Sequence, residues 1–101
     1  MEKKILVVTK DEKKLNRYVE EAENYFGLKK GEYEGICASS FKEAEKFLYK
    51  LDENEQVVKA VDLVVTPFNE GYDTQEWANF ASQLTGVLTG IRIPHLGTSL
   101  S

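Results

Sequence analysis

The chain has 101 residues, of which 42% are hydrophobic and 30% charged, and its net charge at pH 7 is −4. This length suits one domain, residues 1–101, and the composition is that of a folded rather than a disordered chain. The negative charge argues against binding to a phosphate backbone, so we expect no nucleic-acid partner. One cysteine cannot form an internal disulfide, and no apolar run approaches the roughly 20 residues of a membrane span. We therefore expect a cytoplasmic protein without membrane contact.

The first strand and helix lie within residues 4–27. KILVV, residues 4–8, is a continuous apolar run, typical of a strand that is covered on both faces. Thr9 and Glu12 then form a capping-box pattern at the expected start of a helix. The helix is expected to end at Gly27, which adopts the left-handed conformation at low cost. Its apolar stripe consists of Leu15, Tyr18, Val19, Ala22 and Phe26.

A second strand and helix are predicted from residues 33–51. YEGICASS, residues 33–40, is a short apolar strand, and Ser40 and Glu43 form the second capping box. The polar residues 52–56 break the helix, and residues 57–60 either extend it or form a loop. The apolar stripe of this helix is Phe41, Ala44, Phe47, Leu48 and Leu51.

The third strand, residues 60–66, is rich in valine. Asp73 and Glu76 form a third capping box before a third amphipathic helix. The last strand is expected within GIRIPHLGTS, residues 90–99, where Pro94 fits only near the start of the strand or on an edge. The stripe of the third helix is Trp77, Phe80, Ala81, Leu84 and Leu88.

Each capping box directly follows a strand, so the predicted order alternates four strands with three helices. Strand–helix–strand units with right-handed crossovers build a parallel sheet. The prediction is an α/β fold of three layers, in which helices cover both faces of an open four-stranded parallel sheet. In chain order, the strands are expected in the arrangement 2-1-3-4.

A binding site in such a sheet lies at the carboxyl ends of the strands. These ends contain one carboxylate, no histidine and no cysteine, so we expect no catalytic residue, no bound metal and no cofactor. His95, inside the last strand, is expected to be hydrogen-bonded and structural, and Cys37 to pack as a small apolar side chain. The residues at the strand ends are Thr9, Lys10, Asp11, Ser39, Ser40, Thr66, Pro67, Phe68, Asn69, Thr98 and Ser99.

The segments KKILVVTKDEKKL, ICASSFKEAEKFL, VDLVVTPFNEG and RIPHLGTS together resemble response-regulator receiver domains over nearly the whole chain. Receivers have an acidic pair after their first strand, and the resemblance places Thr9 and Lys10 there, followed by Asp11 at a commonly acidic position. It places Pro67 at the aspartate phosphoacceptor and Thr98 at the conserved Thr/Ser position. A fifth strand with its lysine has no counterpart.

The resemblance therefore implies a non-catalytic, receiver-like signalling or regulatory module that acts through protein contacts without aspartyl phosphorylation. Lys10 would put a positive charge where a receiver holds its cation. The alternative is a small ligand-binding or enzymatic α/β domain that uses the crevice at the strand ends, in which case Pro67 simply ends a strand.

A sheet that ends on its fourth strand has an edge with unpaired backbone groups, which invites pairing with another chain. We therefore expect a homodimer, or a tight complex with another protein, formed through the third helix and the fourth strand. The residues expected in this interface are Trp77, Phe80, Leu84, Ile93 and Leu96.

Overall fold

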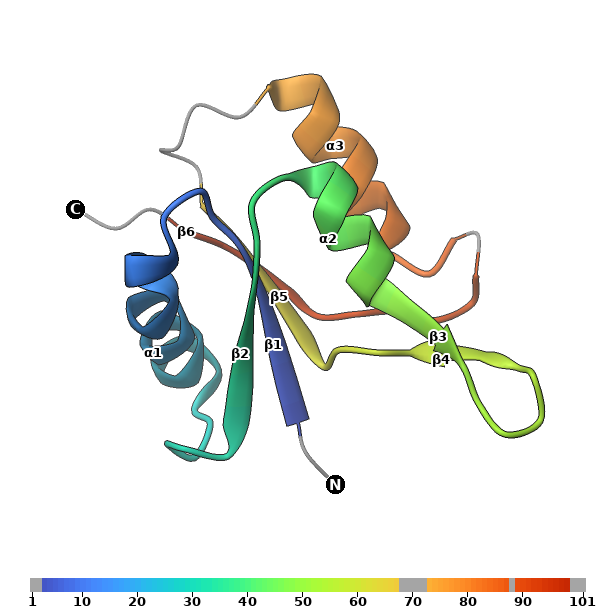
Figure 1. Cartoon of the computed structure of the whole chain (residues 1–101), viewed down its shortest axis with the longest axis horizontal. Helices are drawn as coiled ribbons and strands as arrows, with labels where there is room; N and C mark the ends of the chain where they lie inside the picture. Colours follow the sequence, from blue (N-terminus) through green and yellow to red (C-terminus); the bar gives the residue numbers. More distant parts are fainter. Residues whose placement is uncertain (1–2, 68–72, 88, 99–101) are drawn as a thin grey trace.

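A computed structural model describes residues 3–67, 73–87 and 89–98 of the chain. Its helices and strands alternate along most of the sequence (Figure 1). They are β1 (Lys3–Val8), a short 3-10 helix η1 (Glu12–Lys14), α1 (Leu15–Phe26), β2 (Tyr33–Ala38), α2 (Phe41–Leu48), β3 (Tyr49–Leu51), β4 (Val57–Lys59), β5 (Leu63–Pro67), α3 (Thr74–Gln83) and β6 (His95–Thr98).

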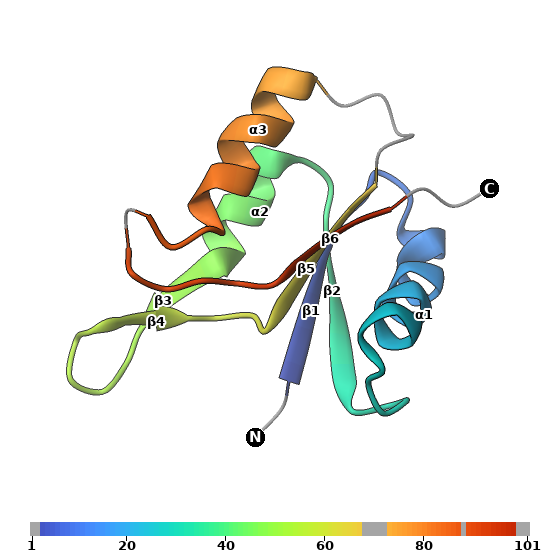
Figure 2. The ribbon, with the colours of Figure 1, turned by 180° about the vertical axis from the view of Figure 1, so that it is seen from behind.

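Four strands form one parallel sheet in the order β2-β1-β5-β6. The α1 helix covers one face of this sheet, and α2 and α3 lie together over the other face (Figures 1 and 2). The predicted α/β fold, with a four-stranded parallel sheet and three helices, is confirmed. The carboxyl ends of all four strands consequently meet at one edge of the sheet.

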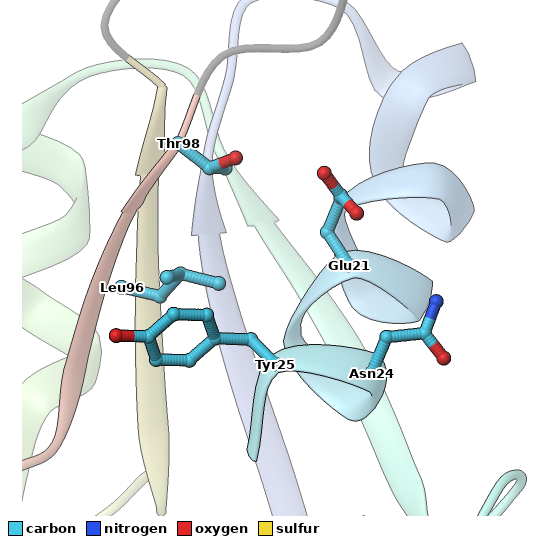
Figure 3. A pocket seen from close by; sticks show the side chains of 5 residues that line it. All are labelled: Glu21, Asn24, Tyr25, Leu96 and Thr98. Carbon is cyan, nitrogen blue, oxygen red and sulfur yellow. The ribbon is translucent and has the colours of Figure 1, made fainter. Parts of the chain in front are cut away.

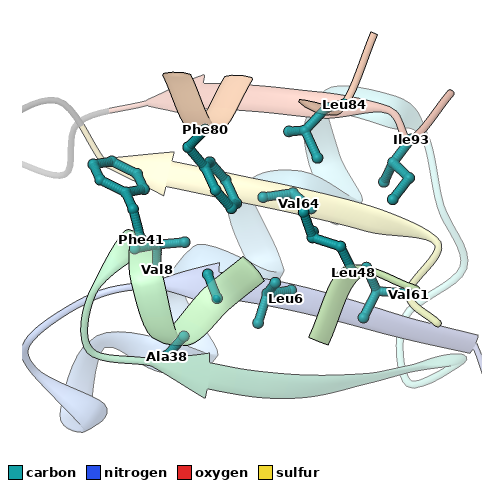
Figure 4. Close-up of a cluster of buried hydrophobic side chains, with 11 residues drawn as sticks. Leu6, Val8, Ala38, Phe41, Leu48, Val61, Val64, Phe80, Leu84 and Ile93 are labelled. Atoms are coloured by element: carbon teal, nitrogen blue, oxygen red, sulfur yellow. The ribbon is translucent and has the colours of Figure 1, made fainter. Parts of the chain in front are cut away.

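The two faces of β1 supply the centres of two separate cores. Leu6 and Val8 point toward α2 and α3, in a cluster with Phe41, Leu48 and Phe80 (Figure 4). On the other face, the alternate residues of β1 pack under α1, in a cluster made of Ile5, Val7, Tyr18, Ala22, Leu63, Val65 and Leu96. The period of two in a strand explains why KILVV is apolar throughout: both of its faces are buried.

The packing of α1 on the sheet depends on a glycine in β2. A Cβ atom added to Gly35 would lie 2.9 Å from Cγ2 of Val19 and 3.3 Å from Cδ1 of Leu15. A larger residue at this position would therefore require the side chain of Val19, or the helix that carries it, to shift. It ends as predicted at Gly27, whose φ of 65° is in the left-handed region.

The second and third helices begin at their predicted caps. The side chain of Ser40 accepts a hydrogen bond from the backbone N–H of Glu43 at 3.1 Å. The carboxylate of Asp73 accepts from the N–H groups of Gln75 and Glu76 at 2.8 and 3.1 Å. Each cap pairs backbone donors that the first turn of a helix leaves without partners.

The capping box predicted at Thr9 and Glu12 is wrong. The N–H of Thr9 donates to the carbonyl of Ala38 at 2.8 Å, so the pairing of β1 with β2 continues through Thr9. The helical path therefore starts two residues later, where the carboxylate of Asp11 caps η1 by accepting from the N–H of Lys13 at 3.0 Å.

The segment after α2 also differs from the prediction. The helix ends at Leu48, because Tyr49 is already extended, and β3 and β4 form an antiparallel hairpin where a longer helix or a loop was expected. Leu51, assigned to the apolar stripe of the helix, is exposed on this hairpin. The hairpin projects from the body of the molecule and is attached to it by Tyr49, whose hydroxyl donates to the carbonyl of Gln83 at 2.7 Å (Figure 1).

Candidate functional site

The described strand-end residues of the predicted site fall into groups on different strands. Thr9, Lys10 and Asp11 lie beyond β1, next to the end of β2, whereas Thr66 and Pro67 belong to β5. Phe68, Asn69 and Ser99, which were also predicted to contribute, lie outside the described residues. The predicted crevice across all the strand ends, which includes Asn69, therefore stays a prediction.

The first group lines an open hollow of about 420 Å³ at the ends of β1 and β2. Ser39 comes from the turn that leads into α2 and Glu43 from the first turn of that helix, so this hollow joins two strand ends to the start of a helix. The lining consists of Thr9, Lys10, Asp11, Glu12, Lys13, Cys37, Ser39 and Glu43.

Several polar groups of this hollow already have structural partners. The hydroxyl of Thr9 accepts from the N–H of Asp11 at 3.2 Å, and the carboxylate of Asp11 caps η1. The carboxylate of Glu43 accepts from the hydroxyl of Ser39 at 2.6 Å and from its N–H at 3.3 Å. The hydrogen bonds from Ser39 hold the pKa of Glu43 below its usual range. Both carboxylates thus stabilise the turns that carry them.

Pro67, at the position where the resemblance puts a phosphoacceptor, is buried at the end of β5 opposite Thr98 of β6. On its other side β5 pairs with β1, with Val65 opposite Val7. The chain beyond β1, with Thr9 and Lys10, therefore reaches the same edge of the sheet as Pro67. At this edge lie the buried hydroxyl of Thr9, which is bonded to the backbone of Asp11, the ammonium group of Lys10 and the ring of Pro67, and the carboxylate of Asp11 caps η1.

A hydrogen-bonded cluster of Thr66, Trp77 and His95 lies on the α3 side of the same edge. The indole N–H of Trp77 donates to Oγ1 of Thr66 at 3.1 Å, and Nε2 of His95 lies 2.6 Å from the same oxygen. Thr66 is fully buried, and its oxygen already accepts a hydrogen bond from the indole. The hydroxyl proton of Thr66 is therefore the one that fits between Oγ1 and an unprotonated Nε2 of His95. Burial lowers the pKa of His95, which favours this neutral imidazole.

Sequence reasoning named these three residues separately and missed the cluster. The alternation of side chains along a strand could have predicted this cluster, because residues two apart face the same side of a sheet. Thr66 lies two residues after Val64, and His95 lies two residues after Ile93, so all four side chains face α3. Trp77, at the start of the apolar stripe of α3, then reaches both polar side chains.

Thr98 faces the other way. It lines a shallow groove of about 270 Å³ between α1 and β6, together with Glu21, Asn24, Tyr25 and Leu96 (Figure 3). Thr66 and Thr98 therefore lie on opposite faces of the sheet, because β5 and β6 are in register with Pro67 opposite Thr98.

The residues predicted for a protein interface are mostly part of the core. Phe80, Leu84 and Ile93 are buried among the side chains of α2 and the sheet (Figure 4), and Leu96 is buried on the α1 face. Only Trp77 is partly exposed, and its indole N–H is bonded to Thr66. The structure corrects this prediction: these apolar side chains cover the chain's own sheet and leave little surface for a partner.

Comparisons of the chain with protein-family models, with characterised proteins and with solved structures found no match.

Among the described residues, no three side chains of His, Cys, Asp or Glu are grouped in a way that could hold a metal ion. No helix in the described part of the chain combines the length and the apolar character needed to cross a bilayer.

Proposed function

We propose that this chain is a non-catalytic, receiver-like signalling or regulatory module that works through contacts with another protein, without aspartyl phosphorylation. The observation that supports this most is the position of Pro67, buried at the carboxyl end of β5 beside the end of β1. The sheet order β2-β1-β5-β6 is the order expected for a receiver-like sheet without its fifth strand.

The chemistry of the edge supports the absence of phosphotransfer. Aspartyl phosphorylation needs a carboxylate nucleophile and a divalent cation that neutralises the phosphoryl oxygens. Proline has no nucleophilic group, and Lys10 brings a positive charge to the place where a cation would bind. The carboxylate that follows Lys10 in the sequence, that of Asp11, accepts a hydrogen bond from the N–H of Lys13 and caps the start of η1.

Phosphodonor treatment tests this proposal directly. After incubation with acetyl phosphate and Mg²⁺, the intact mass of the protein should show no phosphoryl adduct. The Pro67→Asp variant should also remain unmodified, because a new carboxylate alone does not supply a cation site. An adduct on the wild-type chain that disappears in Asp11→Asn would refute the proposal and assign a working phosphoacceptor to this edge.

The hollow at the ends of β1 and β2 favours a second candidate, a small ligand-binding domain. Its lining combines the cations Lys10 and Lys13 with the carboxylates of Asp11, Glu12 and Glu43, and the two lysines are the groups that would bind a small anion. Titration with beryllofluoride and Mg²⁺, followed by backbone amide NMR shifts, distinguishes the two functions. Saturable shifts at residues 9–13 and 39–43 support ligand binding, and unchanged spectra support the protein-contact module.

A further inference from the structure

The cluster of Thr66, Trp77 and His95 joins three elements of the fold through one oxygen atom. Oγ1 of Thr66, in β5, accepts the indole N–H of Trp77 from α3 at 3.1 Å and lies 2.6 Å from Nε2 of His95 in β6. The rings of Trp77 and His95 lie next to each other, with centroids 5.8 Å apart. The protonation state of one imidazole therefore bears directly on how α3, β5 and β6 are held together.

This arrangement fits a neutral His95 and does not fit a charged one. With Nε2 unprotonated, Oγ1 accepts the indole N–H and donates its own proton to the imidazole, so the hydroxyl, the indole N–H and Nε2 all have a partner. A proton added to Nε2 turns this acceptor into a donor, and the hydroxyl proton of Thr66 then has no acceptor within the cluster. Thr66 is fully buried, so an unpaired hydroxyl there is costly.

In the described part of the chain, no anion is placed to compensate a charge on His95. Besides His95, the three elements carry one ionisable side chain, that of Glu76 in α3, which is exposed. The carboxylate of Asp73 is bonded to backbone N–H groups of the first turn of α3, and Arg92, before β6, is an exposed cation. Burial lowers the pKa of His95 with no contribution from any of these charges. A protonated ring is therefore better solvated outside the cluster, and His95 is already partly exposed.

The C-terminal half of α3 is attached to the molecule at several points. The N–H of Ile93 donates to the carbonyl of Leu84, the C-cap of the helix, at 3.0 Å. The hydroxyl of Tyr49 donates to the carbonyl of Gln83 at 2.7 Å. Phe80 and Leu84 are also buried in the core under α3 (Figure 4). None of these contacts involves the cluster, so they hold this half in place when the cluster changes.

The N-terminal half of α3, residues 74–79, is attached to the sheet through Trp77. In the residues that the structure describes, the other side chains of this half are exposed, and none of them bonds to the sheet. Trp77 is partly buried, and its ring packs against the core next to its bond with Thr66. The attachment of this half thus depends on one side chain and its partners in the cluster.

We propose that this cluster is a pH-sensitive switch, in which protonation of His95 at Nε2 releases the imidazole from Thr66 and loosens the N-terminal half of α3. The proton comes from water, and the hydroxyl proton stays on Thr66. When the imidazole leaves, Trp77 loses a packing neighbour, and water reaches Oγ1 and competes with the indole N–H. The part of α3 that loosens lies beside the carboxyl ends of the strands, so the switch changes the surface at that edge. It goes beyond the proposed function, because it acts within the chain and needs no partner.

Nitrogen-15 NMR of the full chain tests the protonation step. At neutral pH, Nε2 of His95 should have the shift of an unprotonated nitrogen and Nδ1 that of an N–H group, and a neutral ring with its proton on Nε2 overturns the proposal. As the pH falls from about 8 to about 5, both nitrogens should titrate together below the ordinary pKa of 6.5. A ring that stays neutral through this range also overturns the proposal.

Amide hydrogen exchange over the same pH range tests the loosening. After division by the intrinsic rate at each pH, exchange at residues 77–79 should become about tenfold faster once His95 is protonated, the equivalent of one lost hydrogen bond. Exchange at residues 82–84 and at Ile93 should not change. Equal changes in both halves of α3, or no change at residues 77–79, overturn the proposal.

His95→Gln is the matched neutral variant, because its amide oxygen can accept the proton of Thr66 and takes up no proton in this range. Exchange at residues 77–79 should then be independent of pH, and a response like that of the wild type overturns the proposal. Glu76→Gln removes the other ionisable side chain of the three elements and should leave the response intact. Loss of the response in Glu76→Gln assigns it to the glutamate and overturns the proposal as well.

Thr66→Val decides the matter if His95→Gln does not fold. A hydrogen bond from the hydroxyl to Nε2 favours the neutral ring, so its removal should move the titration of His95 to higher pH. A midpoint that is the same in Thr66→Val and in the wild type shows that the hydroxyl does not control protonation, and it overturns the proposal.

Discussion

Replacing Thr66 with valine should destabilise the protein through its hydrogen bonds alone, since the two side chains have nearly the same shape. The hydroxyl is fully buried and bonded to the indole of Trp77 and to Nε2 of His95. Each lost bond leaves one polar group, the indole N–H or Nε2 of His95, with one partner fewer. This lowers the free energy of unfolding by about 1 kcal/mol per group when the group still has some access to water. The expected loss is therefore about 2 kcal/mol in the free energy of unfolding, or roughly 8 to 16 °C in Tm for a chain of this size.

Urea unfolding, followed by tryptophan fluorescence, measures this loss, because Trp77 is the only tryptophan. Thr66→Ser is the matched control: it keeps the hydroxyl and removes one methyl group, at a cost of about 1 kcal/mol. Thr66→Val should therefore be the less stable variant, with a shifted emission maximum that Thr66→Ser does not show. If the valine variant is as stable as wild type, or the serine variant loses more, the hydrogen bonds are not what this hydroxyl contributes.

Two further predictions concern pH and packing. Burial lowers the pKa of His95, so the unfolded chain binds a proton more readily than the folded one, and the free energy of unfolding should fall as the pH drops through the ordinary value of 6.5. Since His95 is the only histidine, the slope in this range should vanish in His95→Gln, and a slope that persists there contradicts the assignment. Gly35→Ala should cost about 1 to 3 kcal/mol, because its Cβ would lie 2.9 Å from Val19, and chemical denaturation should show part of this regained in a Val19→Ala background. A Gly35→Ala protein with wild-type stability would show that α1 moves away from β2 at no cost.

The alternation of strands and helices could be predicted because most elements have local signals. The run KILVV is apolar on both faces, and Ser40 and Asp73 cap the helices that they were expected to cap. The start of the first helix was predicted wrongly at Thr9, because the capping pattern there competes with strand pairing. A capping box is a local signal, and it cannot show how far a neighbouring strand continues.

The hairpin had no such signal. Its strands have three residues each, too few for a period of two to be recognised, and the spacing of Leu51 from Leu48 also fits a helix. The interface prediction failed for a related reason. An apolar stripe on a helix shows that it is covered, but not whether its own sheet or another protein covers it, and here Phe80 and Leu84 pack on the chain's own sheet.

Within the candidate site, residue types were easier to predict than their grouping. Thr66 and Thr98 were both expected at strand ends, and both are there. Which face of the sheet each one joins depends on the register between β5 and β6, which the sequence of either strand alone does not determine. That register places Thr98 on the opposite face of the sheet from Thr66 and brings His95 next to Thr66.

The bond between Leu48 and Ala60 also has a consequence for how this chain can change over evolution. The carbonyl of Leu48 accepts the N–H of Ala60 at 2.8 Å, so the hairpin leaves the body of the molecule and returns to it at almost the same point. A segment whose two ends meet can be lengthened, shortened or exchanged at a small entropic cost, since the cost of closing a loop grows only with the logarithm of its length. The hairpin can therefore vary in length and sequence while the path from α2 into β5 stays the same.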